Sequence, residues 1–276
     1  MDSKTISMRP LYVLLFVSSF CFSQQSDPNF LKGFEELMNE KPEKALKSFS
    51  KVLRKDPKNA KALMFTGSIK AVLGMNNDAL IDLDRSIALD PQIAETYHYR
   101  SLVCYSNNQI KDAITDVSKA IQLDPLNTGY VYNRAKFYIE TGNYEGAIKD
   151  GEYMLSLDQV ASNPYILHCM AEAYAGLGLY NAALAKADEF IDIDGRTAGY
   201  VLRGDIYYQM ENYAFAANDY EQFINDENAN TSKGEAYLKA GNTYLRMKKN
   251  ERACVLFQSA LTSGMTVEDS LLQLCH

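Results

Sequence analysis

The chain has 276 residues, of which 47% are hydrophobic and 23% are charged, with 15 glycines and 7 prolines. This composition is typical of a folded globular protein and excludes a disordered or collagen-like chain. The formal net charge is −7. An acidic chain lacks the excess of cations that supplies most nucleic-acid affinity and that attracts proteins to anionic membranes. We therefore expect no nucleic-acid partner.

The first 23 residues have the pattern of a secretory signal. Lys4 and Arg9 precede an apolar run at residues 11–22, and the small residue Ser23 follows it. We expect residues 1–23 to be a cleaved signal peptide, which makes the mature protein secreted or periplasmic. One alternative is an uncleaved segment that anchors the chain in a membrane, the only membrane association that we expect. Another is a lipoprotein signal with Cys21 as the lipidated residue.

The rest of the chain repeats one pattern. An alanine recurs at intervals of 34, 34, 34, 36, 33 and 37 residues. Its seven occurrences are Ala45, Ala79, Ala113, Ala147, Ala183, Ala216 and Ala253. Twelve residues before each alanine lies another small residue; these are Gly33, Gly67, Ser101, Ala135, Ala171, Gly204 and Gly241. A fixed period of this length predicts an array of structural repeats.

Each repeat is expected to be a pair of helices joined by a tight turn. Gly74, Gly142 and Gly178 lie where the end of the first helix must adopt a left-handed conformation. Small residues are needed where two helix axes come closest, because the distance between axes depends on the side chains at the contact. Larger apolar residues at helical spacing fill the neighbouring layers. One pair cannot bury its own apolar face, so we expect the pairs to stack into a solenoid.

The pattern resembles the tetratricopeptide repeat family, whose unit is a 34-residue helix-turn-helix. The repeat from residue 94 shows the resemblance well, with Tyr97, Ser101, Ala113, Ala120 and Pro125 in the family's places. The resemblance implies an all-α fold, a right-handed α-α superhelix of seven helix-turn-helix repeats plus a C-terminal capping helix, over residues 24–276. The expected units are residues 26–59, 60–93, 94–127, 128–161, 164–196, 197–230 and 234–267, with the cap at 267–275.

The two longer intervals predict irregular joints near residues 161–164 and 226–233. The second joint is polar and loop-like, and it is either a hinge or an inert longer loop. After it, Thr266 to Asp269 form an N-cap signal for the short capping helix.

No motif in the chain predicts catalysis, a cofactor or a metal site. His98 and His168 lie two repeats apart, and no cysteine pair at metal spacing accompanies them. Cys104 and Cys169 are expected to be buried and free, whereas Cys254 and Cys275 could form a disulfide if the last helix folds back. We therefore expect a protein that is not an enzyme and that has no cofactor.

The family resemblance implies that ligands bind in the groove lined by the first helices of the repeats. The residues at the family's peptide-contacting positions are Met64, Ser68, His98, Tyr105, Tyr132, Lys136, Tyr165, His168, Glu172, Asp205, Tyr208, Asn242 and Arg246. Tyrosines mixed with a few charges suit a protein or peptide ligand, although individual tyrosines could instead complete the core. Phe30 and Phe34 occupy the first pair of places of the family's carboxylate clamp, which argues against that specialised function.

These patterns predict a non-catalytic interaction scaffold that is exported and binds a protein or peptide in its concave groove. The alternative is a structural subunit of a cell-envelope or secretion complex that docks through its terminal repeats. An enzyme is disfavoured because no unassigned stretch of the chain could hold a catalytic domain.

Overall fold

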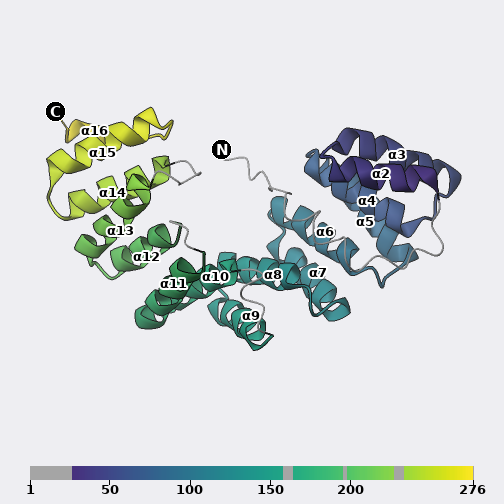
Figure 1. The fold of residues 1–276 in the computed structure, drawn as a ribbon, viewed down its shortest axis with the longest axis horizontal. Helices are drawn as coiled ribbons and strands as arrows, with labels where there is room; N and C mark the ends of the chain where they lie inside the picture. The colour runs from purple at the N-terminus through teal and green to yellow at the C-terminus, as the bar shows by residue number, and fades with distance from the viewer. Residues whose placement is uncertain (1–26, 158–163, 195–197, 227–232, 276) are drawn as a thin grey trace. The chain divides into compact units, whose positions relative to one another are not determined.

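The computed structural model describes residues 27–157, 164–194, 198–226 and 233–275, and these contain helices and no strand (Figure 1). The predicted signal peptide lies outside the described residues, and so do residues 227–232 of the expected hinge and 161–163 of the other joint. Both the export signal and the hinge therefore remain predictions. The chain divides into two compact units, Met1–Phe137 and Tyr138–His276.

The described part of the first unit alternates first and second helices of successive pairs. Its helices are α2 (Pro28–Met38), α3 (Pro42–Lys55), α4 (Ala60–Val72), α5 (Asn76–Leu89), α6 (Ala94–Ser106), α7 (Ile110–Leu123) and most of α8 (Thr128–Glu140). Each pair packs internally and on the next, so that α3 contacts α4 and α5 contacts α6.

The second unit continues the same alternation. Its helices after the end of α8 are α9 (Tyr144–Ser156), α10 (Tyr165–Gly176), α11 (Tyr180–Asp194), α12 (Ala198–Gln209), α13 (Tyr213–Asn225), α14 (Gly234–Arg246), α15 (Asn250–Thr262) and α16 (Asp269–Gln273). The predicted fold class, an all-α array of consecutive helix-turn-helix pairs, is confirmed. Among the described residues, no helix is both long enough and apolar enough to cross a membrane.

Every helix-turn-helix pair has the same turn. One residue per turn has φ between 54° and 76°; these residues are Glu40, Gly74, Asn108, Gly142, Gly178, Glu211 and Lys248. The next residue donates its N–H to the carbonyl five residues earlier, as from Met75 to Lys70 at 2.8 Å. This is the Schellman motif, which satisfies carbonyls at the end of the first helix. The left-handed conformation predicted for the three glycines is confirmed.

The two series of small residues lie inside the pairs. All seven marker alanines are fully buried. Four of the other small residues are glycines, and each lies against a large side chain of the second helix 16 residues later in the chain. A Cβ atom on Gly67 would lie 2.6 Å from Cγ of Leu83, and one on Gly241 would lie 2.6 Å from Cε1 of Phe257. The helices of a pair therefore approach closely because the first helix has no side chain at the contact.

The last helix covers the end of the array. Val267 is buried, and it packs with Phe257 and Ala260 of α15. The helix begins at Asp269 with Glu268 as its cap residue, later than the Thr266 signal predicts, and the buried Val267 precedes it. A disulfide joins Cys254 of α15 to Cys275, with their Cα atoms 5.5 Å apart, whereas Cys104 and Cys169 are free and buried.

This pairing predicts a labelling result. Protein denatured without reductant and treated with iodoacetamide should carry two fewer carbamidomethyl groups than protein that is reduced first, since only Cys254 and Cys275 are protected. Intact mass spectrometry measures the difference. In Cys275→Ser the bond to Cys254 cannot form, and Cys104 and Cys169 are buried, so folded monomeric variant protein should gain nothing on reduction. Equal labelling of the wild-type chain before and after reduction would contradict the pairing.

Candidate functional site

The candidate site is the face formed by the first helices of the repeats, called here the first-helix face. In the first unit α4 contacts α6, and in the second unit α10 contacts α12. First helices of successive repeats are therefore neighbours within each unit, which brings the sequence-predicted residues of one unit onto adjacent helices. Each unit carries its own part of this face.

In the first unit, Tyr132 and Lys136 lie one turn apart on α8. Lys136 is exposed, and its Nζ lies 5.8 Å from the centroid of the half-buried Tyr132 ring. Tyr105 of α6 stacks on Phe137, with 4.7 Å between ring centroids. At such a place the ammonium group can attract an acidic group of a partner, and the aromatic ring can pack against an apolar one.

Met64 and His98 of the same unit are buried, with 4% and 6% of their surface exposed. The His98 ring lies 4.7 Å from the Tyr130 ring, and its Nε2 shares a 2.9 Å hydrogen bond with the side-chain amide of Asn133. Burial lowers the pKa of His98 to about 4, because the charged imidazolium would lose its hydration. These two residues, like the buried Ser68, offer little surface to a ligand.

In the second unit, Tyr208 and Arg246 are brought together by a residue that the sequence reasoning missed. Tyr213, at the start of α13, accepts a 3.2 Å hydrogen bond from Nε of Arg246. The Arg246 guanidinium also lies 5.7 Å from the Tyr213 ring centroid, and the Tyr208 ring meets the Tyr213 ring edge-on at 5.4 Å. The hydrogen bond to Tyr213 raises the pKa of Arg246, and this exposed side chain is charged.

Asp205 of the same face is already engaged by other side chains. Its carboxylate accepts a 2.7 Å hydrogen bond from the Tyr220 hydroxyl and forms a 2.7 Å ion pair with Lys239 of α14. Burial and the charge of Asp205 raise the pKa of Tyr220, which keeps the phenol protonated as the donor. Asp205 therefore connects α12, α13 and α14.

The remaining predicted residues of this unit lie on α10 and α14. On α10, Nε2 of His168 lies 3.4 Å from the exposed carboxylate of Glu172. Tyr165 is 39% exposed, and its ring lies 5.5 Å from Phe190. On α14, Asn242 is half-buried. Among the described residues, no group of three or more histidine, cysteine, aspartate or glutamate side chains could hold a metal ion.

Comparison with known proteins agrees with this architecture. A family model described as tetratricopeptide repeat matches residues 33–92, and another of the same description matches residues 235–263. The chain contains tetratricopeptide repeats. Human tetratricopeptide repeat protein 16 is 28% identical over 151 residues, a stretch that spans 46% of this chain but only 16% of that protein.

Two solved structures are similar to this chain in fold. A tetratricopeptide repeat protein from Parabacteroides merdae is 21% identical with a TM-score of 0.72, over 89% of this chain and 96% of that one. PilW, a type IV pilus biogenesis factor, is 18% identical with a TM-score of 0.63, over 75% of this chain and 97% of that one. Tetratricopeptide repeats generally mediate interactions between proteins.

The sequence reasoning also missed an ion-pair motif that recurs in two of the repeats. Nε and Nη2 of Arg100 bind both carboxylate oxygens of the buried Asp116, at 2.7 and 2.6 Å, and Nη1 binds Asp84 of the preceding repeat at 2.7 Å. Arg203 binds Asp219 and Asp188 in the same way. The available signal was an aspartate three residues after the marker alanine, at positions 82, 116, 150 and 219. Since both arginines are fully engaged, they stabilise the array and do not enlarge the site.

The buried His98 predicts a pH-dependent stability. The unfolded state, with an ordinary histidine pKa of 6.5, takes up the proton before the folded state does, whose pKa is about 4. The contribution of the neutral imidazole is thus complete above pH 6.5 and is lost as the pH falls towards 4. Between neutral pH and about pH 4.5 the unfolding free energy of the wild type should fall by about 2–3 kcal/mol more than that of His98→Asn.

Urea unfolding of both proteins at the two pH values, followed by circular dichroism, measures this difference. Any loss of packing in His98→Asn is common to both pH values and cancels. Parallel pH profiles for the two proteins would contradict the assignment of His98 as a neutral buried side chain.

Proposed function

We propose that this chain is an exported, non-catalytic interaction module that binds a protein or peptide on its first-helix face. The observation that carries the proposal is the pairing of partly exposed tyrosines with cations on this face. Lys136 lies beside Tyr132 in the first unit, and Arg246 lies on Tyr213 beside Tyr208 in the second. Aromatic and arginine side chains dominate the energetics of protein interfaces, because they bury a large area and also form polar contacts.

Export is supported by two independent features. The first is the signal-like sequence of residues 1–23. The second is the disulfide between Cys254 and Cys275, since disulfides persist in oxidising compartments and are rare in the reducing cytosol. The mature protein would then meet its partner outside the cytoplasm.

A second candidate is a subunit that assembles into an envelope or secretion complex through its terminal repeats. It is favoured by large apolar side chains that remain exposed at the C-terminal end, where Val255 is 57% and Leu274 is 55% exposed. The similarity in fold to PilW, a pilus biogenesis factor, is compatible with this role.

The two candidates make different predictions for partner capture. A variant with Tyr132→Ala, Lys136→Glu and Tyr208→Ala should lose its native partner while keeping its helical circular dichroism, because these side chains lie at the surface of their helices. Affinity purification from the native cells with crosslinking, read by mass spectrometry, measures capture. Lys111→Glu with Lys149→Glu, on the second helices α7 and α9, is the control and should capture normally.

Retained capture by the triple variant would exclude the first-helix face as the main site. If Val255→Asp with Leu274→Asp abolished capture instead, the assembly role would replace the proposed one.

A further inference from the structure

The first unit carries a concentrated positive charge that the net charge of the chain conceals. Between Lys41 and Lys70 there are nine basic and two acidic residues, whereas residues 138–276 contain 10 basic and 20 acidic ones. Most of the basic residues belong to α3 and to the loop that follows it. This segment therefore has a charge opposite to that of the rest of the chain.

Five of these cations form a stripe along α3, called here the basic stripe: Lys44, Lys47, Lys51, Arg54 and Lys55. Each lies three or four residues from another member of the stripe, so they share one face of the helix, and all five are exposed. Lys55 forms a 2.9 Å ion pair with Asp27. Within the described part of the chain, the other four have no carboxylate within salt-bridge distance.

Helix stability does not explain the stripe. Like charges one turn apart destabilise a helix by about 0.2–0.5 kcal/mol per pair. Cations are favourable only near the C-terminus of a helix, which accounts for Arg54 and Lys55 but not for Lys44 in the first turn. The opposite face of α3 is buried in the core, where Ala45, Phe49 and Val52 pack. Surface charges that destabilise their own helix are expected at functional sites.

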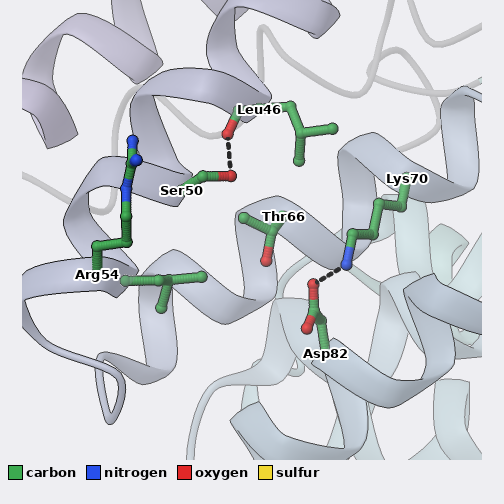
Figure 2. A pocket seen from close by; sticks show the side chains of 7 residues that line it. Leu46, Ser50, Arg54, Thr66, Lys70 and Asp82 are labelled. Carbon is green, nitrogen blue, oxygen red and sulfur yellow. Dashed lines mark hydrogen bonds and ion pairs between the residues drawn. The ribbon is translucent and has the colours of Figure 1, made fainter.

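A pocket of about 220 Å³ lies beside the stripe. It is lined by Leu46, Ser50, Leu53 and Arg54 of α3, by Thr66 and Lys70 of α4, and by Asp82 of α5, whose charge is paired with Lys70. Figure 2 shows Thr66 between the α3 residues and the ion pair that Lys70 forms with Asp82 at 2.6 Å. The pocket is smaller than the sites that hold drug-sized ligands, and it has the size for one side chain. Arg54 belongs to both the pocket and the stripe.

We propose that α3 is a second docking surface, which binds an acidic segment of a partner protein along the basic stripe and one apolar side chain of that segment in the pocket. Charge complementarity selects an anionic partner. Amphipathic helices that bind membranes expose large apolar side chains, whereas the apolar face of α3 lies in the core. Proteins that bind single-stranded nucleic acid stack bases on aromatic rings, and the stripe contains none. Because Leu46 and Leu53 line the pocket, we favour a peptide partner over a membrane or a nucleic acid.

The test uses the full chain and two fluorescein-labelled probes, a short polyglutamate peptide and the same peptide with one central leucine, in fluorescence anisotropy at low salt. Lys47→Glu with Lys51→Glu should weaken both probes about tenfold, since each reversal removes one attraction and adds one repulsion. The control Lys111→Glu with Lys149→Glu makes the same change in net charge on other second helices and should alter binding less than about twofold.

The thermal midpoint of unfolding checks that the stripe variant still folds. It should be unchanged or higher than that of the wild type, because the substitutions relieve repulsion between like charges on α3.

A separate variant tests the role of the pocket. Ser50→Leu fills it, so the leucine probe should weaken about fivefold to the level of the polyglutamate probe, which should bind as before. The Tyr132, Lys136 and Tyr208 variant should bind both probes normally, which separates this surface from the first-helix face.

Three results would overturn the proposal. One is equal weakening by the stripe variant and its matched control. Another is binding of phosphatidylserine vesicles or duplex DNA that the stripe variant abolishes while neither peptide binds. The last is self-association in sedimentation equilibrium that only the stripe variant loses, which would make a second copy of this acidic chain the occupant.

Discussion

The structure depends on the close approach of the two helices within each repeat. A first helix with glycine, serine or alanine at the crossing point leaves room for a side chain of the second helix, as Gly204 does for Tyr220 and Gly33 does for Phe49. The contact is therefore a side chain packed on bare backbone, and in one pair the backbone also approaches, with Ala79 O 3.1 Å from the position of a Cβ on Gly67. Every surface of the array is positioned by these buried contacts.

The fold could be predicted from the sequence because its determinants are local and periodic. A small residue, a left-handed turn and a buried alanine recur in the same order, and each has one structural solution. The non-glycine residues in the turns, such as Glu40 and Lys248, show that the position in the repeat imposes the conformation even where the residue type does not favour it. The exact start of α16 at Asp269 cannot be read from the sequence, because the burial of Val267 is a tertiary contact with no periodic signal.

The candidate site could be predicted only in part. Periodicity places Tyr208 and Arg246 on first helices, but their connection through Tyr213 depends on a residue of a second helix. It also cannot show that His98 is enclosed by Tyr130 and Asn133 of the next first helix. The net charge of the whole chain is also a poor guide to its surface, because an average over an acidic chain conceals the local excess of cations along α3. Contacts between repeats require the three-dimensional arrangement, whereas the excess of cations can be read from residues 41–70 of the sequence.

The central claim is that side chains of the second helix pack directly on the first helix; at the crossing of α4 and α5 this requires glycine, and Gly67→Ala tests that requirement by the sign of its effect. In an ordinary helix interior this change is stabilising by about 1 kcal/mol, because alanine has the higher helix propensity. Here the new methyl group would lie 2.6 Å from Leu83 Cγ. Overpacking of a core costs about 1–3 kcal/mol, so the account predicts a lower urea midpoint for the variant than for the wild type. A higher midpoint would show that the crossing has room to spare and would contradict the account.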